Sequence, residues 1–178
     1  GLVLNPEAVK VETQLRDTGR FSRNWLSVGM PHQIIGLELE AERIESRGFR
    51  STSYSAQYSL TGNGFTDIAP AVSVGIRDIT RSGTEGRAAY LAMSKSIGMS
   101  RSLEQQVKSL KVHAGYGTSR LDGPFGGVSV STKLGPKLSA EYVAHEVNGS
   151  IGIGLIRGVE AKVAWVQRAA NYGVSILL

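Results

Sequence analysis

Apolar and polar residues alternate along most of this chain, and this alternation restricts the fold more than any other feature of the sequence. It recurs at residues 9–16, 35–42, 53–60, 110–116, 138–145 and 151–155. A period of two is the pattern of a β-strand with one apolar face, whereas a helix repeats every 3.6 residues. In a helix, Glu38, Glu40 and Glu42 would spread around the cylinder, but in a strand they share one face. We therefore expect an all-β protein.

Turn residues separate these runs at intervals of roughly 10 to 15 residues, as in an antiparallel meander. Asn148-Gly149 is the clearest hairpin signal, because both residues tolerate the positive φ of a type I′ turn. Residues 100–110 carry helical spacing and are expected to form a loop or a short helix. The count predicts about twelve strands in a single domain over residues 1–178, with residues 1–7 as an N-terminal extension.

The composition supports one closed sheet. Glycine is unusually frequent, at 22 of 178 residues, and many glycines fall within expected strands. There they lower strand propensity, and we interpret them as sites of curvature or of space inside a closed sheet. The chain has no cysteine, which excludes disulfides, thiolate metal sites and a cysteine nucleophile.

Twelve amphipathic strands can close in two ways. A soluble sandwich turns its apolar faces inward, whereas a membrane barrel turns them outward to lipid. Eight aromatic residues fall on the expected apolar face, mostly near turns, as in the girdles that flank a barrel's lipid-facing band. They are Trp25, Tyr54, Tyr58, Tyr90, Tyr116, Tyr142, Trp165 and Tyr172. The strands expected over residues 137–178 are short for a membrane span, at about 8 residues each against the usual 9 to 11.

The sequence also resembles the YjbH-like family of outer-membrane β-barrel proteins, which are linked to exopolysaccharide export. The resemblance is strongest over residues 65–178. It is carried by the segments PAVSVGIRDI (70–79), YLAMSK (90–95), HAGYGTSRLDG (113–123), FGGV (125–128) and AEY (140–142). It implies an outer-membrane barrel and a process that involves a polysaccharide. It supplies no catalytic residues.

Charged residues on the expected polar faces are the candidate functional groups. They are Glu38, Glu40, Glu42, Arg77, Arg87, Lys95, Lys111 and Lys162. In a barrel they would line the lumen, either neutralising one another across strands or forming a cationic stripe that guides an anion. A sandwich would place them on its solvated surface.

Nothing in the sequence indicates an enzyme. The three histidines are far apart and poorly supplied with carboxylates. No Gly-x-Ser-x-Gly elbow is present, and the glycines of residues 152–158 do not match a dinucleotide-binding spacing. We predict no catalytic residues, no cofactor and no metal.

The predicted function is that of an outer-membrane β-barrel, either a passive pore or a component associated with export of an anionic polysaccharide. The expected partners are outer-membrane lipid, an anionic polysaccharide or small anions, and a homo-oligomer or envelope complex, but not nucleic acid. Two alternatives stay open: a non-conducting structural subunit of an envelope assembly, and a soluble ligand-binding β-sandwich.

Overall fold

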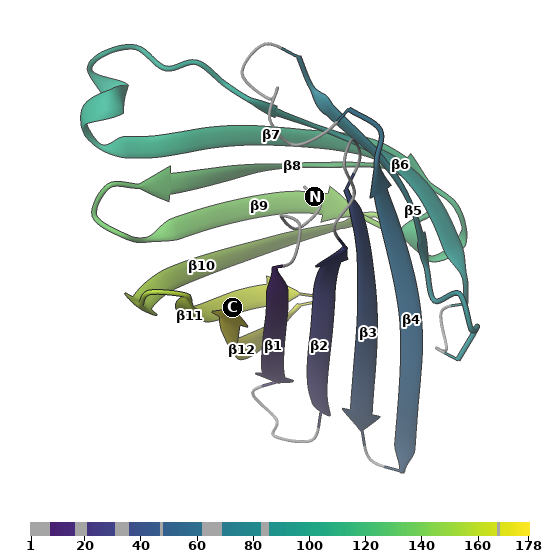
Figure 1. Cartoon of the computed structure of the whole chain (residues 1–178). Helices are drawn as coiled ribbons and strands as arrows, with labels where there is room; N and C mark the ends of the chain where they lie inside the picture. Colours follow the sequence, from purple (N-terminus) through teal and green to yellow (C-terminus); the bar gives the residue numbers. More distant parts are fainter. Residues whose placement is uncertain are drawn as a thin grey trace.

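Twelve antiparallel strands form one closed barrel in the computed structural model, which describes residues 8–16, 21–30, 36–46, 48–61, 69–82, 86–166 and 168–178 (Figure 1). The strands are β1 (Val9–Arg16), β2 (Phe21–Met30), β3 (Leu37–Ser46), β4 (Phe49–Ser59), β5 (Ala71–Arg77), β6 (Ala88–Ser96), β7 (Val107–Gly117), β8 (Gly123–Thr132), β9 (Lys137–Val143), β10 (Glu146–Ile156), β11 (Val159–Val166) and β12 (Ala169–Leu177). Each strand pairs with its neighbours in sequence, and β1 pairs with β12. This confirms the predicted all-β, twelve-stranded meander and excludes the two-sheet sandwich.

The first and last strands close the ring. Their register runs from Lys10 opposite Leu177 to Arg16 opposite Asn171. We call the end where β1 starts and β12 finishes the termini end. The other end, where the six hairpins β1–β2, β3–β4, β5–β6, β7–β8, β9–β10 and β11–β12 turn, is the hairpin end.

The barrel has the inverse polarity of a soluble protein. On its outer face Leu39, Leu91 and Val163 are 44%, 46% and 48% exposed, whereas the inward-facing Ser53 and Ser73 are 5% and 6% exposed. The alternation of each strand therefore places its apolar residues outside and its polar and small residues around the lumen. This is the arrangement of outer-membrane-type barrels.

The predicted hairpin turn at Asn148-Gly149 is wrong. Asn148 and Gly149 lie within β10, where they pair with Glu141 and Ala140 of β9, and the turn before β10 is at Ala144 and His145 instead. Both turn residues have positive φ, at 50° and 62°, although neither is glycine.

Residues 100–110 form no α-helix. They contain one short 3-10 helix, η1 (Leu103–Gln105), and then β7 begins at Val107. The predicted extension at residues 1–7 lies outside the described residues. Within the described part of the chain, no helix is long and apolar enough to cross a membrane.

The ladder between β4 and β5 is the shortest in the barrel. It joins four residue pairs, from Ala56 with Ile76 to Ser59 with Ser73, whereas β3 and β4 are joined by ten. Beyond it, the backbone N–H of Ile79 donates to the carbonyl oxygen of Tyr54 at 2.7 Å. The hydroxyl of Ser51 donates to the carbonyl of Ser82 at 2.6 Å. The segment after β5 thus lies along the rest of β4 without regular strand pairing.

Candidate functional site

Three carboxylates lie in a row on the lumen face of β3. Glu38, Glu40 and Glu42 alternate with the outward-facing Leu37, Leu39 and Ala41, and they pair with small or polar lumen residues on both neighbouring strands. On β4 these partners are Gln57, Ser55 and Ser53, and on β2 they are Gly29, Ser27 and Trp25. The row is therefore an acidic strip of the lumen wall.

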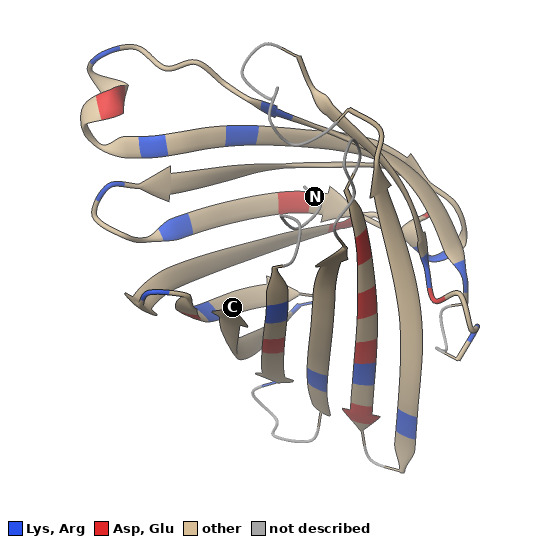
Figure 2. Ribbon diagram, viewed as in Figure 1, with Lys and Arg blue, Asp and Glu red and all other residues tan. Residues whose placement is uncertain are grey.

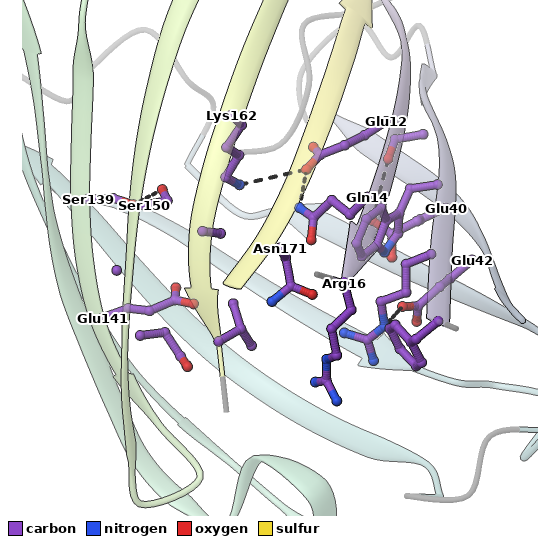
Figure 3. A pocket seen from close by; sticks show the side chains of 18 of the residues that line it. Glu12, Gln14, Arg16, Glu40, Glu42, Ser139, Glu141, Ser150, Lys162 and Asn171 are labelled. Atoms are coloured by element: carbon purple, nitrogen blue, oxygen red, sulfur yellow. Dashed lines mark hydrogen bonds and ion pairs between the residues drawn. The ribbon is translucent and has the colours of Figure 1, made fainter. Parts of the chain in front are cut away.

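A polar cavity of about 320 Å³ occupies the lumen next to this strip (Figure 3). Its walls come from β1–β3, β5 and β9–β12, together with the short 3-10 helix η2 (Ser119–Leu121) after β7. Six cationic side chains and four carboxylates line it: Lys10, Arg16, Arg23, Arg77, Arg120 and Lys162, and Glu12, Glu40, Glu42 and Glu141. The lining therefore has two more cations than carboxylates, and four of its six cations are arginines.

Glu12 is the centre of the ion-pair network in the cavity. Its carboxylate lies 2.6 Å from Lys10 Nζ and 3.7 Å from Lys162 Nζ, and it accepts a hydrogen bond from Gln14 Nε2 at 2.6 Å. Figure 3 shows Lys162 and Gln14 both directed at this carboxylate. A carboxylate that is 8% exposed requires such partners. Glu12 thus offsets one of the two positive charges that these lysines bring to the wall.

The arginines nearer the hairpin end are only partly neutralised. Arg23 Nε lies 3.1 Å from Glu42 Oε1. Arg16 stacks over Phe21, with its guanidinium carbon 5.0 Å from the ring centroid, and its buried Nε has no acceptor in the described chain. Arg77 lines the cavity and interacts electrostatically with Glu40, but no carboxylate oxygen of a described residue lies within the 4.0 Å of an ion pair. Guanidinium groups bind carboxylates through two parallel hydrogen bonds, so the hydrogen-bond donors of Arg16 and Arg77 can still bind a carboxylate ligand.

Two aromatic rings occupy the lumen beside β6–β8, which do not line the polar cavity. Tyr90 of β6 lies over Gly75 of β5, and Phe125 of β8 lies over Gly115 of β7. The two rings pack edge to face with centroids 6.3 Å apart, and the Tyr90 hydroxyl donates to Gln57 Oε1 at 2.9 Å. A Cβ at Gly75 would overlap the end of the Tyr90 side chain, so any larger residue there requires that ring to move. The polar cavity is therefore off-centre.

The predicted lumen charges divide into two groups. The strand register places Glu38, Glu40, Glu42, Arg77, Lys111 and Lys162 on the lumen face. Lys95 is on the outer face instead, because it shares the parity of Leu91 and Met93 and pairs with the outward-facing Val112. Arg87 precedes β6 and donates to the carbonyl of Ile79, so it holds the β5–β6 connection rather than lining the lumen. The prediction is wrong for these two residues.

The predicted aromatic girdle also divides. Tyr116, Tyr142, Trp165 and Tyr172 lie on the outer face toward the hairpin end, and Tyr54 lies on the outer face at the middle of β4, each 43–62% exposed. Tyr58 is on the outer face nearer the termini end. Trp25 and Tyr90 point into the lumen, where they pair with the lumen positions Glu42 and Gly75, so their assignment to the girdle is wrong.

Sequence reasoning missed several cavity residues, among them Glu12, Arg16, Arg23 and Arg120. The signal for two of them was present, because Lys10, Glu12, Gln14 and Arg16 form the polar half of the alternation over residues 9–16. Arg120 follows no strand parity, since it lies in η2. No group of three or more metal-ligating side chains occurs among the described residues.

Comparisons with known proteins identify the fold. No family model matches the chain, and no curated protein matches it. Among solved structures it is similar to a KdgM porin, with a TM-score of 0.59 and 13% identity over 96% of this chain and 97% of that one. It is equally similar to a KdgM porin in complex with disordered oligogalacturonate, with a TM-score of 0.60 and 12% identity over the same shares. The chain thus has a porin-like outer-membrane β-barrel fold over nearly its whole length.

Proposed function

We propose that this chain is an outer-membrane barrel whose polar cavity admits acidic saccharide chains or small anions. The observation that carries the proposal is that two lumen guanidinium groups, Arg16 and Arg77, form no close ion pair with a carboxylate of the described chain. A uronate carboxylate matches the paired donors of such groups. The oligogalacturonate complex of a similarly folded porin supports the same class of ligand.

The barrel would act by electrostatic guidance rather than by catalysis. An anion that enters at the hairpin end meets Arg16, Arg23 and Arg77 first, and then the two lysines that share the carboxylate of Glu12. The resemblance to the YjbH-like family leads us to propose outward movement of the polymer as part of an export system. The acidic row of β3 lies beside these guanidinium groups, because Arg23 of the neighbouring strand β2 pairs with Glu42.

Conductance in planar bilayers tests this proposal. We expect an anion-selective current that oligogalacturonate reduces, and a reversal potential that shifts toward the unselective value in an Arg16→Gln/Arg77→Gln variant. Lys95→Gln is the matched control, because it removes a cation from the outer face and should leave the selectivity unchanged. Absence of conductance, or equal selectivity in the lumen variant and the wild type, would overturn the proposal.

A second candidate is a non-conducting structural subunit of an envelope assembly. The packing of Tyr90 and Phe125 in the lumen favours it, because these rings leave less room for a solute. Isolation from native membranes separates the two candidates. A structural subunit should copurify with stoichiometric partners and show no current, whereas a pore should conduct as a monomer or homo-oligomer.

A further inference from the structure

Five exposed cations gather at the termini end of β6–β11, and we call them the basic rim: Lys95, Arg101, Lys108, Lys133 and Arg157. Figure 2 shows basic segments at the ends of β7–β11, at the left of the view. None of the five forms an ion pair with another described residue. Glu104 is the single carboxylate in the described connections β6–β7, β8–β9 and β10–β11. The rim therefore has an uncompensated positive charge that the lumen site does not use.

The position of Lys95 indicates that the basic rim lies on the outer surface of the barrel. It lies on the outer face of β6, beside the exposed Met93 and in register with Val112 of β7. A lysine at such a position extends its aliphatic stem along the apolar surface and places its ammonium group at the polar headgroup layer. The basic rim thus lies where the apolar band of the barrel ends.

Apolar residues at two hairpin tips accompany the cations. Leu134, which follows Lys133, is 93% exposed, and Ile156, which precedes Arg157, is 73% exposed. Adjacent apolar and cationic side chains at one surface are the chemistry that binds an anionic membrane interface. A soluble polyanion would give the apolar tips no favourable environment.

Most of the outer aromatic residues lie toward the other end. Tyr116, Tyr142, Trp165 and Tyr172 lie toward the hairpin end, whereas Tyr54 lies at the middle of β4 and Tyr58 nearer the termini end. Aromatic residues favour a membrane–water interface without requiring negative charge. The exposed cations of the basic rim are therefore not part of this aromatic group.

We infer that the basic rim binds the phosphate-bearing headgroups of anionic lipids at the termini end of β6–β11. This inference rests on the proposed membrane location of the barrel. It adds a lipid-binding surface that the lumen site does not require.

Lipid competition on the detergent-folded barrel tests the inference. The protein is equilibrated with equal amounts of phosphatidylglycerol and phosphatidylcholine, and native mass spectrometry gives the ratio of bound lipids. At low salt we expect phosphatidylglycerol to dominate. The Lys95→Gln/Lys108→Gln/Lys133→Gln variant should lose this preference by about tenfold or more, since each cation near an anionic surface adds roughly a few-fold in affinity. Arg50→Gln/Arg81→Gln/Arg168→Gln, which removes three exposed cations at the hairpin end, should keep the preference.

Two further measurements, competition by inorganic phosphate and insertion into vesicles, test the lipid ligand and separate this inference from the proposed function. Inorganic phosphate at the same concentration should not displace phosphatidylglycerol, and displacement would overturn a lipid site. Equal preference in the rim variant and the wild type would also overturn it. Insertion into vesicles of phosphatidylcholine alone tests the membrane barrel itself. If the barrel inserts but shows no lipid preference, only the lipid binding by the basic rim is refuted. If the barrel does not insert, the proposed function is refuted.

Discussion

At the scale of single residues, strand parity decides which side chains reach the lumen. Tyr90 shares its parity with Ser94, which is 3% exposed on the lumen face, whereas Lys95 shares its parity with Leu91 and Met93. From residue type alone, Tyr90 would be expected in the outer aromatic girdle and Lys95 in the lumen, which is the reverse of what the structure shows. Here position along the strand outweighs residue type, because every side chain of a barrel wall must point either in or out.

Replacement of Gly75 should disturb the packing of Tyr90 in the lumen. In Gly75→Val the new side chain would overlap the Tyr90 ring and disrupt its hydrogen bond to Gln57. We expect a loss of stability of about 1–3 kcal/mol, typical of overpacking. Urea unfolding of the detergent-folded barrel, monitored by its heat-modifiable migration, measures this loss.

Gly154→Val is the control for that measurement. Gly154 also lies in a strand, and a Cβ there would meet nothing within 4 Å. Its replacement should leave the unfolding midpoint nearly unchanged. Equal losses in the two variants would show that strand glycines act through backbone flexibility and not through the space beneath Tyr90.

At the scale of elements, the strand pattern was predictable and some of the turns were not. Alternation over residues 9–16, 35–42 and 138–145 predicts β1, β3 and β9, because apolar outward faces repeat every second residue. The turn before β10 could not be predicted from residue type, since Ala144 and His145 adopt positive φ while Asn148-Gly149 continues the strand. Pairing with β9 outweighs the intrinsic turn preference of the dipeptide.

The short ladder between β4 and β5 should be the first part of the barrel wall to open. It has four residue pairs, whereas the β2–β3 and β3–β4 ladders each have ten. Hydrogen exchange of the detergent-folded protein should therefore exchange the amides of β5 well before those of β3, since local opening follows the number of cooperative contacts. Equal protection of the two strands would show that the segment at Ile79–Ser82 replaces the missing ladder fully.

At the scale of the whole molecule, twelve strands in sequence order could be predicted, but the shape of the lumen could not. The strand count and the closure follow from periodicity and glycine content, whereas the inside-out polarity is favoured by the aromatic residues and the family resemblance, because periodicity fits a sandwich as well as a barrel. The off-centre cavity depends on contacts such as Tyr90 with Phe125 and Arg16 with Phe21, which join residues of different strands. Their meeting is fixed by the register of the closed sheet, and no single strand pattern contains it.

Closure itself predicts an all-or-none requirement for the last strand. A chain that stops before β12 would leave β1 and β11 as unpaired edges, and unsatisfied backbone groups are strongly unfavourable in lipid. We expect the variant that lacks β12 to show no heat-modifiable folded form in detergent or vesicles. A chain lacking residues 1–7 keeps every described strand and should fold. A folded, heat-modifiable form of the chain without β12 would contradict the closed ring.

The seam between β1 and β12 has a consequence for how the barrel is encoded. The N–H of Leu178 donates to the carbonyl of Val9 at 2.9 Å, so the two ends of the described chain are hydrogen-bonded neighbours. Every other strand contact joins elements adjacent in sequence. The architecture is therefore cyclic: a circular permutant opened at the tight turn between β8 and β9 would contain the same twelve neighbour pairs in the same order around the ring. Which strand is synthesised first is a property of the gene, and the folded wall does not depend on it.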